Sequence, residues 1–134
     1  MKIAVVKELF PGERRVALVP ANVPQLAKAK IEVMVESGAG VAAGFPDQLY
    51  ADKGATIVPD RPAALAADIV LQVRSAGMDV DDGASLRDAL RRGQVVIGSC
   101  DPLGQPQAIA RWAETGATLF SLELIPRITR AQSM

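Results

Sequence analysis

The chain has 134 residues, of which 49% are hydrophobic and 22% are charged, a mixture typical of one globular domain and too apolar for a disordered segment. Its 15 basic and 15 acidic residues cancel, which argues against a nucleic-acid-binding protein or a protein held on a membrane by charge. One cysteine and no histidine exclude an intrachain disulfide, a zinc site built from the usual ligands and a catalytic triad.

The first half of the chain alternates short apolar runs with helical stretches. Strands are expected at residues 3–6, 31–35 and 56–58, and helices after residue 20, at 47–53 and at 62–66. Val23, Leu26 and Ala27 recur at i, i+3 and i+4, which gives the helix after Pro20 one apolar stripe. A charged loop at residues 12–19 follows the first strand, and a glycine-rich loop at 38–45 follows the second.

The second half continues the same alternation. Strands are expected at residues 68–73, 95–98 and 118–122, and helices at 85–91 and 105–115. Cys100 follows a strand and is interpreted as a small buried hydrophobic residue. Strands that alternate with helices pair in parallel and carry helices on both faces. We therefore predict one α/β domain over residues 1–134, with a flavodoxin-like, doubly wound and mostly parallel sheet.

The glycine-rich loop raises the question of a dinucleotide site. Gly38, Gly40 and Ala43 fit the pattern G-x-G-x-x-A directly after a strand, and Asp60 lies about twenty residues further on, where a ribose-binding carboxylate is expected. In a dinucleotide-binding fingerprint, however, this loop opens a long helix that holds the pyrophosphate. Residues 44–46 are Gly-Phe-Pro and interrupt any such helix, so we interpret the loop as a structural turn.

Arginines follow several predicted strands. Arg15 lies in the first loop, Arg74 ends the strand at 68–73, and a cluster at 127–133 contains Arg127, Gln132 and Ser133. Open α/β sheets bind ligands at the carboxyl ends of their strands, where a guanidinium and an amide can pair with a carboxamide or a phosphate. The alternative is that these are solvated surface residues. No catalytic acid/base pair or metal-ligand set is indicated.

Four stretches of the chain resemble the alanine dehydrogenase/NAD(P) transhydrogenase α-subunit family. They are residues 7–20, 35–50, 67–73 and 123–134, so the resemblance covers most of the chain. The last stretch is the most specific, because its Pro-Arg-x-x-Arg-Ala-Gln-Ser-Met pattern looks like the transhydrogenase branch. In that family, residues matching Arg127 and Gln132 contact the nicotinamide end of the cofactor, and the residue matching Ser133 is adjacent.

The resemblance implies more than a fold. Transhydrogenase α subunits bind NAD(H) and pass hydride to NADP(H) on a partner subunit, coupled to proton movement through a membrane component. The expected partners are therefore the NADP-binding and membrane subunits and, in the full-length protein, a second α subunit. Family members are longer, and their NAD-binding Rossmann domain follows this segment, so the chain is interpreted as truncated and inactive alone.

The expected location is cytoplasmic, peripheral to the inner membrane through partner subunits. Direct membrane insertion is not expected, because no apolar run in the chain approaches the ~18 residues of a membrane span.

The alanine dehydrogenase branch offers a contrast. It binds a keto acid with an arginine matching Arg15 and a lysine, and it uses a catalytic histidine. In this chain Arg74 stands at the position of that lysine, and Asp101 stands at the position of that histidine. Oxidative deamination needs proton transfers, whereas hydride exchange between two nicotinamides does not. Transhydrogenation is therefore favoured over two alternatives, an alanine dehydrogenase-like fragment and a non-catalytic binding or assembly module.

Overall fold

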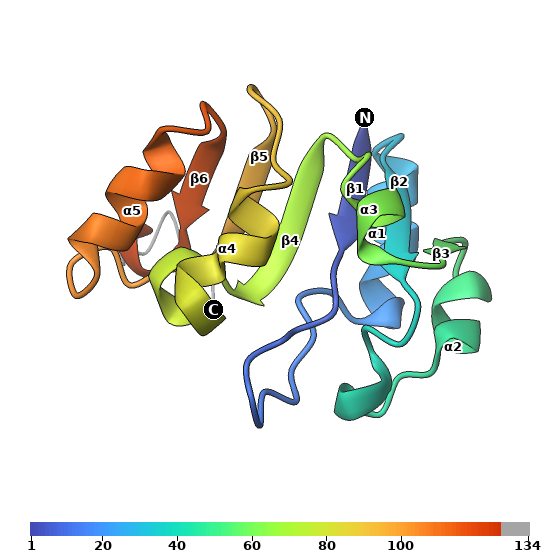
Figure 1. Cartoon of the computed structure of the whole chain (residues 1–134). Coiled ribbons are helices and arrows are strands. Elements are labelled where there is room, and N and C mark those ends of the chain that lie inside the picture. The colour runs from blue at the N-terminus through green and yellow to red at the C-terminus, as the bar shows by residue number, and fades with distance from the viewer. Residues whose placement is uncertain (127–134) are drawn as a thin grey trace.

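The computed structural model describes residues 1–126 of the chain (Figure 1). Within them, six parallel strands form one sheet in the order β3-β2-β1-β4-β5-β6. The strands are β1 (Lys2–Val5), β2 (Glu32–Glu36), β3 (Thr56–Val58), β4 (Ile69–Arg74), β5 (Val95–Ser99) and β6 (Thr118–Ser121). Each lies within two residues of its predicted position at both ends.

The helices connect consecutive strands. They are α1 (Val23–Lys28), α2 (Asp47–Ala51), α3 (Arg61–Ala64), α4 (Ala84–Arg87) and α5 (Pro106–Ala113). Short 3-10 turns are η1 (Pro20–Asn22), η2 (Val41–Ala43), η3 (Ala76–Met78), η4 (Val80–Gly83) and η5 (Leu122–Leu124). No helix within residues 1–126 is both long and apolar enough to cross a membrane.

The prediction of a doubly wound parallel α/β sheet is confirmed, and the strand order refines it. A flavodoxin-like sheet has the order 2-1-3-4-5, whereas here β3 lies outside β2 and β4 pairs with β1, as in doubly wound sheets of the dinucleotide-binding type. The alternation of strands and helices predicts that the strands pair in parallel, but it does not predict which edge of the sheet the third strand joins. The order reverses between β1 and β4, so the connections that leave these two strands diverge.

Two hydrophobic clusters lie on opposite faces of the sheet. One face packs residues such as Ala4, Val70 and Val96 under α3, α4 and α5, together with the buried Trp112. The other packs residues such as Val5 and Val35 under α1 and α2, around Tyr50. Helices on both faces are therefore confirmed, since successive residues of one strand enter opposite clusters.

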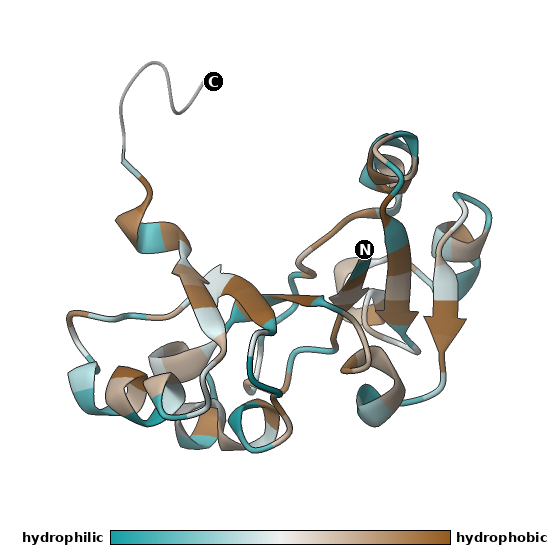
Figure 2. Ribbon diagram, turned by 90° about the horizontal axis from the view of Figure 1, so that it is seen from above, coloured by the Kyte–Doolittle hydropathy of each residue, from teal (hydrophilic) through white to brown (hydrophobic). Residues whose placement is uncertain are grey.

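The two halves of the sheet are covered differently. Residues 3–6 of the first half are buried in succession, whereas burial in β5 alternates from one residue to the next. Figure 2 shows helices on both sides of the first half and on one side of the half nearer the C-terminal end. We call the uncovered side chains of β5 and β6 the bare face; they are Val95, Ile97, Thr118 and Phe120, of which Phe120 is 56% exposed.

Candidate functional site

The candidate site lies at the carboxyl ends of β1 and β4, where the strand order reverses. The loop that follows β1 projects beyond the arrowheads of the sheet (Figure 1), and β4 ends beside it at Arg74. Such a point of divergence leaves a crevice in doubly wound sheets, and ligands bind there. Arg15 and Arg74, both singled out from the sequence, lie at this edge.

Glu8 anchors the first loop to the end of β4. The backbone N–H of Val73 donates to one carboxylate oxygen of Glu8 at 2.6 Å, and the N–H of Arg74 donates to the other at 3.1 Å. Burial raises the pKa of Glu8 above its ordinary value, and the two backbone hydrogen bonds oppose this rise without cancelling it. Both oxygens of this carboxylate therefore serve the backbone of a neighbouring strand.

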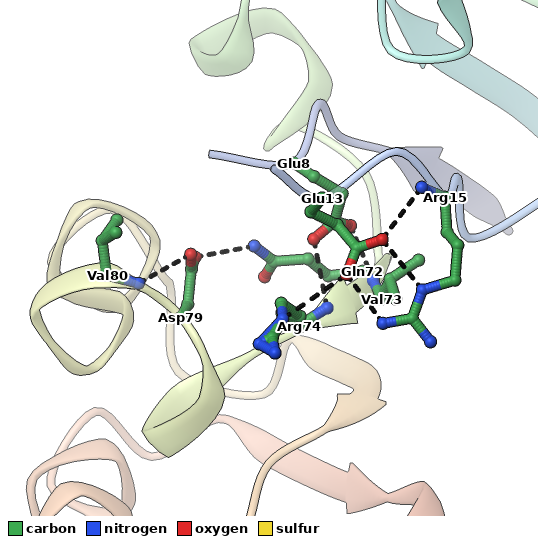
Figure 3. Close-up of polar contacts among 8 residues, drawn as sticks. All are labelled: Glu8, Glu13, Arg15, Gln72, Val73, Arg74, Asp79 and Val80. Atoms are coloured by element: carbon green, nitrogen blue, oxygen red, sulfur yellow. Dashed lines mark hydrogen bonds and ion pairs between the residues drawn. The ribbon is translucent and has the colours of Figure 1, made fainter. Parts of the chain in front are cut away.

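Glu13 binds both arginines of the site (Figure 3). Its carboxylate accepts from Nε of Arg15 at 2.8 Å and from Nη2 at 2.7 Å, and it lies 3.4 Å from Nε of Arg74. The hydrogen bond from the Arg15 side chain is the main cause that lowers the pKa of Glu13 to about 2. The Glu13 side chain is only 7% exposed, so a nearly covered carboxylate joins the two guanidinium groups.

Arg74 is held from a second side by an aromatic ring. Its guanidinium carbon lies 3.9 Å from the centroid of the Phe10 ring, a cation–π distance. Arg15, in contrast, keeps 67% of its side chain exposed. Of the two candidate arginines, Arg15 is therefore the one with surface available to a ligand.

A cavity of about 280 Å³ lies beside this cluster. It is slightly smaller than the usual range of small-molecule sites. The first loop and the glycine-rich loop form its walls, through Lys7, Glu8, Glu13, Arg15, Gly38, Ala39, Val41 and Ala42. The volume suits one end of a cofactor or a small anion better than a whole dinucleotide.

A buried polar pair lies behind Arg74 (Figure 3). Nε2 of Gln72 donates to a carboxylate oxygen of Asp79 at 2.9 Å, and the other oxygen accepts from the N–H of Val80 at 2.8 Å. Gln72 is 2% exposed. Since a buried amide that bonds a buried carboxylate fixes both side chains, this pair holds the turn after β4 in place.

The glycine-rich loop has a structural explanation. The N–H of Gly38 donates to Asp47 at 2.9 Å, and a Cβ on Gly40 would lie 2.6 Å from the Tyr50 ring. The loop continues into η2 and ends at Gly44, in the left-handed conformation with φ 87°, so no long helix opens there, as predicted. Asp60 accepts a hydrogen bond from the N–H of Ala63 at 2.9 Å and caps α3.

The remaining sequence candidates are of three kinds. Cys100 is fully buried, its Sγ lies 3.3 Å from the Gly98 carbonyl oxygen, and burial raises its pKa to about 12, which confirms its interpretation as a buried core residue. Asp101 lies at the end of β5 with φ 47°, and its side chain accepts from the N–H of Gly104. Arg127, Gln132 and Ser133 lie outside the described residues.

The sequence singles out both arginines and the charged cluster Glu13-Arg14-Arg15, but not the contacts that the carboxylates make. Nothing in the spacing of Glu8 and Glu13 indicates that they reach β4. Gln72 gave a usable signal, because a lone amide within the apolar run of a buried strand needs a partner. Among the side chains that the structure describes, which in residues 1–126 leave out Asp82, no group of three His, Cys, Asp or Glu could hold a metal ion.

Comparisons with known proteins agree with this architecture. A family model described as alanine dehydrogenase/PNT, N-terminal domain, matches residues 4–134. The NAD(P) transhydrogenase subunit alpha of Cereibacter sphaeroides is 38% identical over all of this chain, which spans 25% of that protein. Alanine dehydrogenase 1 of Staphylococcus aureus is 33% identical over 98% of this chain, which spans 34% of that protein.

A solved structure gives the same result. The crystal structure of transhydrogenase from Sinorhizobium meliloti superposes on all of this chain with a TM-score of 0.89 and 40% sequence identity. This chain covers 38% of that structure. The chain thus spans between a quarter and two-fifths of the length of the proteins that it resembles.

Proposed function

This chain belongs to the alanine dehydrogenase/PNT N-terminal domain family, and we propose that it serves as the first domain of the α subunit of an NAD(P) transhydrogenase. In this role it holds a nicotinamide in position for direct hydride transfer between NADH and NADP⁺. The proposal is supported by the transhydrogenase relatives and by the sequence of residues 123–134.

One observation carries the choice between the two branches of the family. The carboxylates at the switch point are already engaged, since Glu8 accepts from the backbone of β4 and Glu13 binds both candidate arginines. Asp101, aligned with the histidine of the alanine dehydrogenase branch, accepts from Gly104. Oxidative deamination needs an available acid/base group. Hydride transfer between nicotinamides needs only accurate positioning.

The residues present fit the nicotinamide end of NAD(H) and not the whole cofactor. The cavity of about 280 Å³ is small, and the N–H of Gly38, which would face a pyrophosphate in a fingerprint loop, donates to Asp47. We propose that Arg127 and Gln132 hydrogen-bond the carboxamide of the nicotinamide and that Ser133 lies beside them. The bound nicotinamide supplies or accepts the hydride. The wall formed by the first loop excludes water when a cofactor-binding domain closes on it.

The wider assembly follows as part of the proposal. Most of the NAD(H) contacts would come from a Rossmann domain outside this chain. The NADP-binding subunit and the membrane subunit would be its partners, with a second α subunit completing a homodimer. The domain would then work in the cytoplasm, peripheral to the inner membrane through those partners.

A chimera tests the proposed function. This chain replaces the matching residues of the Cereibacter sphaeroides α subunit, which is assayed with its partner subunits for hydride exchange between NADH and NADP⁺. We expect exchange with the unmodified chain and a loss of about 100-fold in kcat for Arg127→Ala or Gln132→Ala, because misplaced reactants lose rate on that scale. Arg92→Ala is the control, because Arg92 is an exposed arginine near the amino end of β5, away from the site.

The same chimera separates the alternatives. Turnover of pyruvate, ammonium and NADH, with no exchange between nicotinamides, would support an alanine dehydrogenase-like role. A folded chimera with neither activity would support a binding or assembly module. For this chain alone, we expect NADH to bind no more tightly than ~1 mM, a binding free energy of about 4 kcal/mol. Nicotinamide emission is the better signal, because Trp112, on α5, is buried in the hydrophobic core.

A further inference from the structure

Glu123 connects the end of β6 to the end of β5. One oxygen of its carboxylate accepts from the backbone N–H of Cys100 at 2.8 Å and from that of Asp101 at 3.0 Å. The other accepts from the hydroxyl of Ser121 at 2.5 Å. Burial opposes the charge of Glu123, but the hydrogen bonds from Ser121 and from the backbone outweigh it, so the pKa is lowered and the carboxylate is ionised at neutral pH.

The segment that leaves β6 has little apolar packing to hold it. Its large hydrophobic side chains are exposed, with 45% for Leu122, 59% for Leu124 and 43% for Ile125. Exposed apolar side chains contribute little to fixing a segment, because most of their surface stays in water. The Glu123 carboxylate is therefore the main described contact that fixes residues 122–126 against the sheet.

The receiving end of this contact is a strained turn. Asp101 adopts φ 47°, a left-handed conformation that costs a residue with a Cβ more than it costs glycine. This conformation follows Cys100 and points two successive N–H groups at one carboxylate oxygen, an arrangement that binds anions. The strain at Asp101 is explained if the turn is built to receive the carboxylate of Glu123.

We propose that Glu123 is a positioning residue for hydride transfer, which fixes against β5 the start of the segment that carries Arg127 and Gln132. The proposal rests on the function proposed above. Arg127 is four residues beyond this anchor in the sequence, directly after the last described residue, Pro126.

The anchor is tested first in this chain, by amide hydrogen exchange of the unmodified protein, Glu123→Gln and Glu123→Ala. We expect the amides of Cys100, Asp101 and residues 122–126 to exchange about tenfold faster in both variants, since a charged hydrogen-bond acceptor is lost. Ser121→Ala removes only the hydroxyl contact and should give a smaller increase. Glu114→Gln, which alters an exposed carboxylate directly after α5, is the matched control and should change none of these amides.

The positioning role is tested in the chimera. We expect Glu123→Gln to lower kcat for hydride exchange about tenfold while the KM for NADH and the urea midpoint of unfolding stay unchanged. A purely structural role would instead shift the unfolding midpoint and leave kcat per folded molecule unchanged. Either that result, or unchanged amide exchange at Cys100 and Asp101, would overturn the proposal.

Failure of the proposed function gives a different pattern. If the unmodified chimera transfers no hydride, the proposed function is wrong and Glu123 has no role in positioning for it. Faster exchange at Cys100 and Asp101 in the variants would then identify Glu123 as a structural anchor only. The two measurements therefore assign a failure to one proposal or to the other.

Discussion

The two halves of the sheet are built from strands of similar composition but are covered differently. In the first half, β1 and β2 have helices on both faces, and their central residues are buried one after another. In the second half, β5 and β6 have α4 and α5 on one face, and the bare face remains on the other (Figure 2). Buried parallel strands read as continuous apolar runs, so the sequence of β5 suits a strand covered on both faces.

The difference shows that hydrophobicity and burial are separate properties of a strand. Val95-Val96-Ile97 is as apolar as Ile3-Ala4-Val5, yet only Val96 of the first triplet is buried, while all of the second triplet is. What decides burial is whether a helix lies over the face, and this depends on the connections between strands.

An aromatic residue in each half offers the sharpest test. Tyr50 lies on α2 and is fully buried in the cluster that contains residues of β2. Phe120, on the bare face, is 56% exposed. We expect Tyr50→Ala to lower the free energy of unfolding by about 3–5 kcal/mol, because it leaves a cavity and unpairs the Leu18 carbonyl. Phe120→Ala should cost less than about 1 kcal/mol. Urea unfolding measures both, and equal costs would contradict the contrast between the halves.

Alkaline pH probes the covered face of the second half. Burial raises the pKa of Cys100 from 9.0 to about 12 in the folded chain. The stability that this gives is fully present below pH 9 and is lost as pH rises from 9 to 12. In this range the Cys100 thiol ionises in the unfolded chain but not in the folded one. The loss is up to about 1.4 kcal/mol per pH unit. Cys100→Ala should remove this component from a series of urea titrations. An unchanged slope would mean that the thiol is accessible.

Acid pH probes the connection between the halves. Glu13 follows β1, and its partner Arg74 ends β4. The pKa of Glu13 is lowered from 4.5 to about 2, so its stabilising effect is present above pH 4.5 and is lost as pH falls towards 2. Because Arg15 is exposed and screened, we expect Glu13→Gln to cost only about 1 kcal/mol at neutral pH. The variant should flatten the unfolding curve between pH 4.5 and 2, whereas Glu114→Gln should not.

We expect a substitution on the bare face to change the solubility of the protein more than its free energy of unfolding. Phe120→Ser removes the most exposed aromatic side chain of that face, so we expect less self-association in sedimentation at high concentration and weaker binding of a hydrophobic dye. Val41→Ser is the control, since Val41 is 60% exposed but lies in the first half. An equal change for both variants would show that the bare face has no special role.

The sequence predicted the elements better than their arrangement. All six strands appear where short apolar runs lie between turn residues. The helices are shorter than predicted, as in α2, which ends at Ala51 and not at residue 53, because a local pattern places a helix end only to within one or two residues. The strand order and the bare face depend on contacts between distant segments, which no local pattern encodes.

The site was predicted in the same incomplete way. Arg15 and Arg74 were placed at the carboxyl edge because both follow strands, and the structure brings them to one carboxylate. That this carboxylate is Glu13, and that Phe10 covers Arg74, follows from the path of a loop without regular structure. Loops carry the functional residues of such folds, and their paths are the least predictable part of a sequence.

The Glu13 contact also affects competition for the site. A carboxylate two residues from Arg15 in the chain acts as a tethered ligand, and even flexible tethers give an effective concentration in the millimolar range. A free carboxylate from solution must therefore exceed that concentration before it displaces Glu13 from the guanidinium group. Small organic acids present at lower levels would leave the pair intact, so the domain would keep one conformation of this loop in their presence.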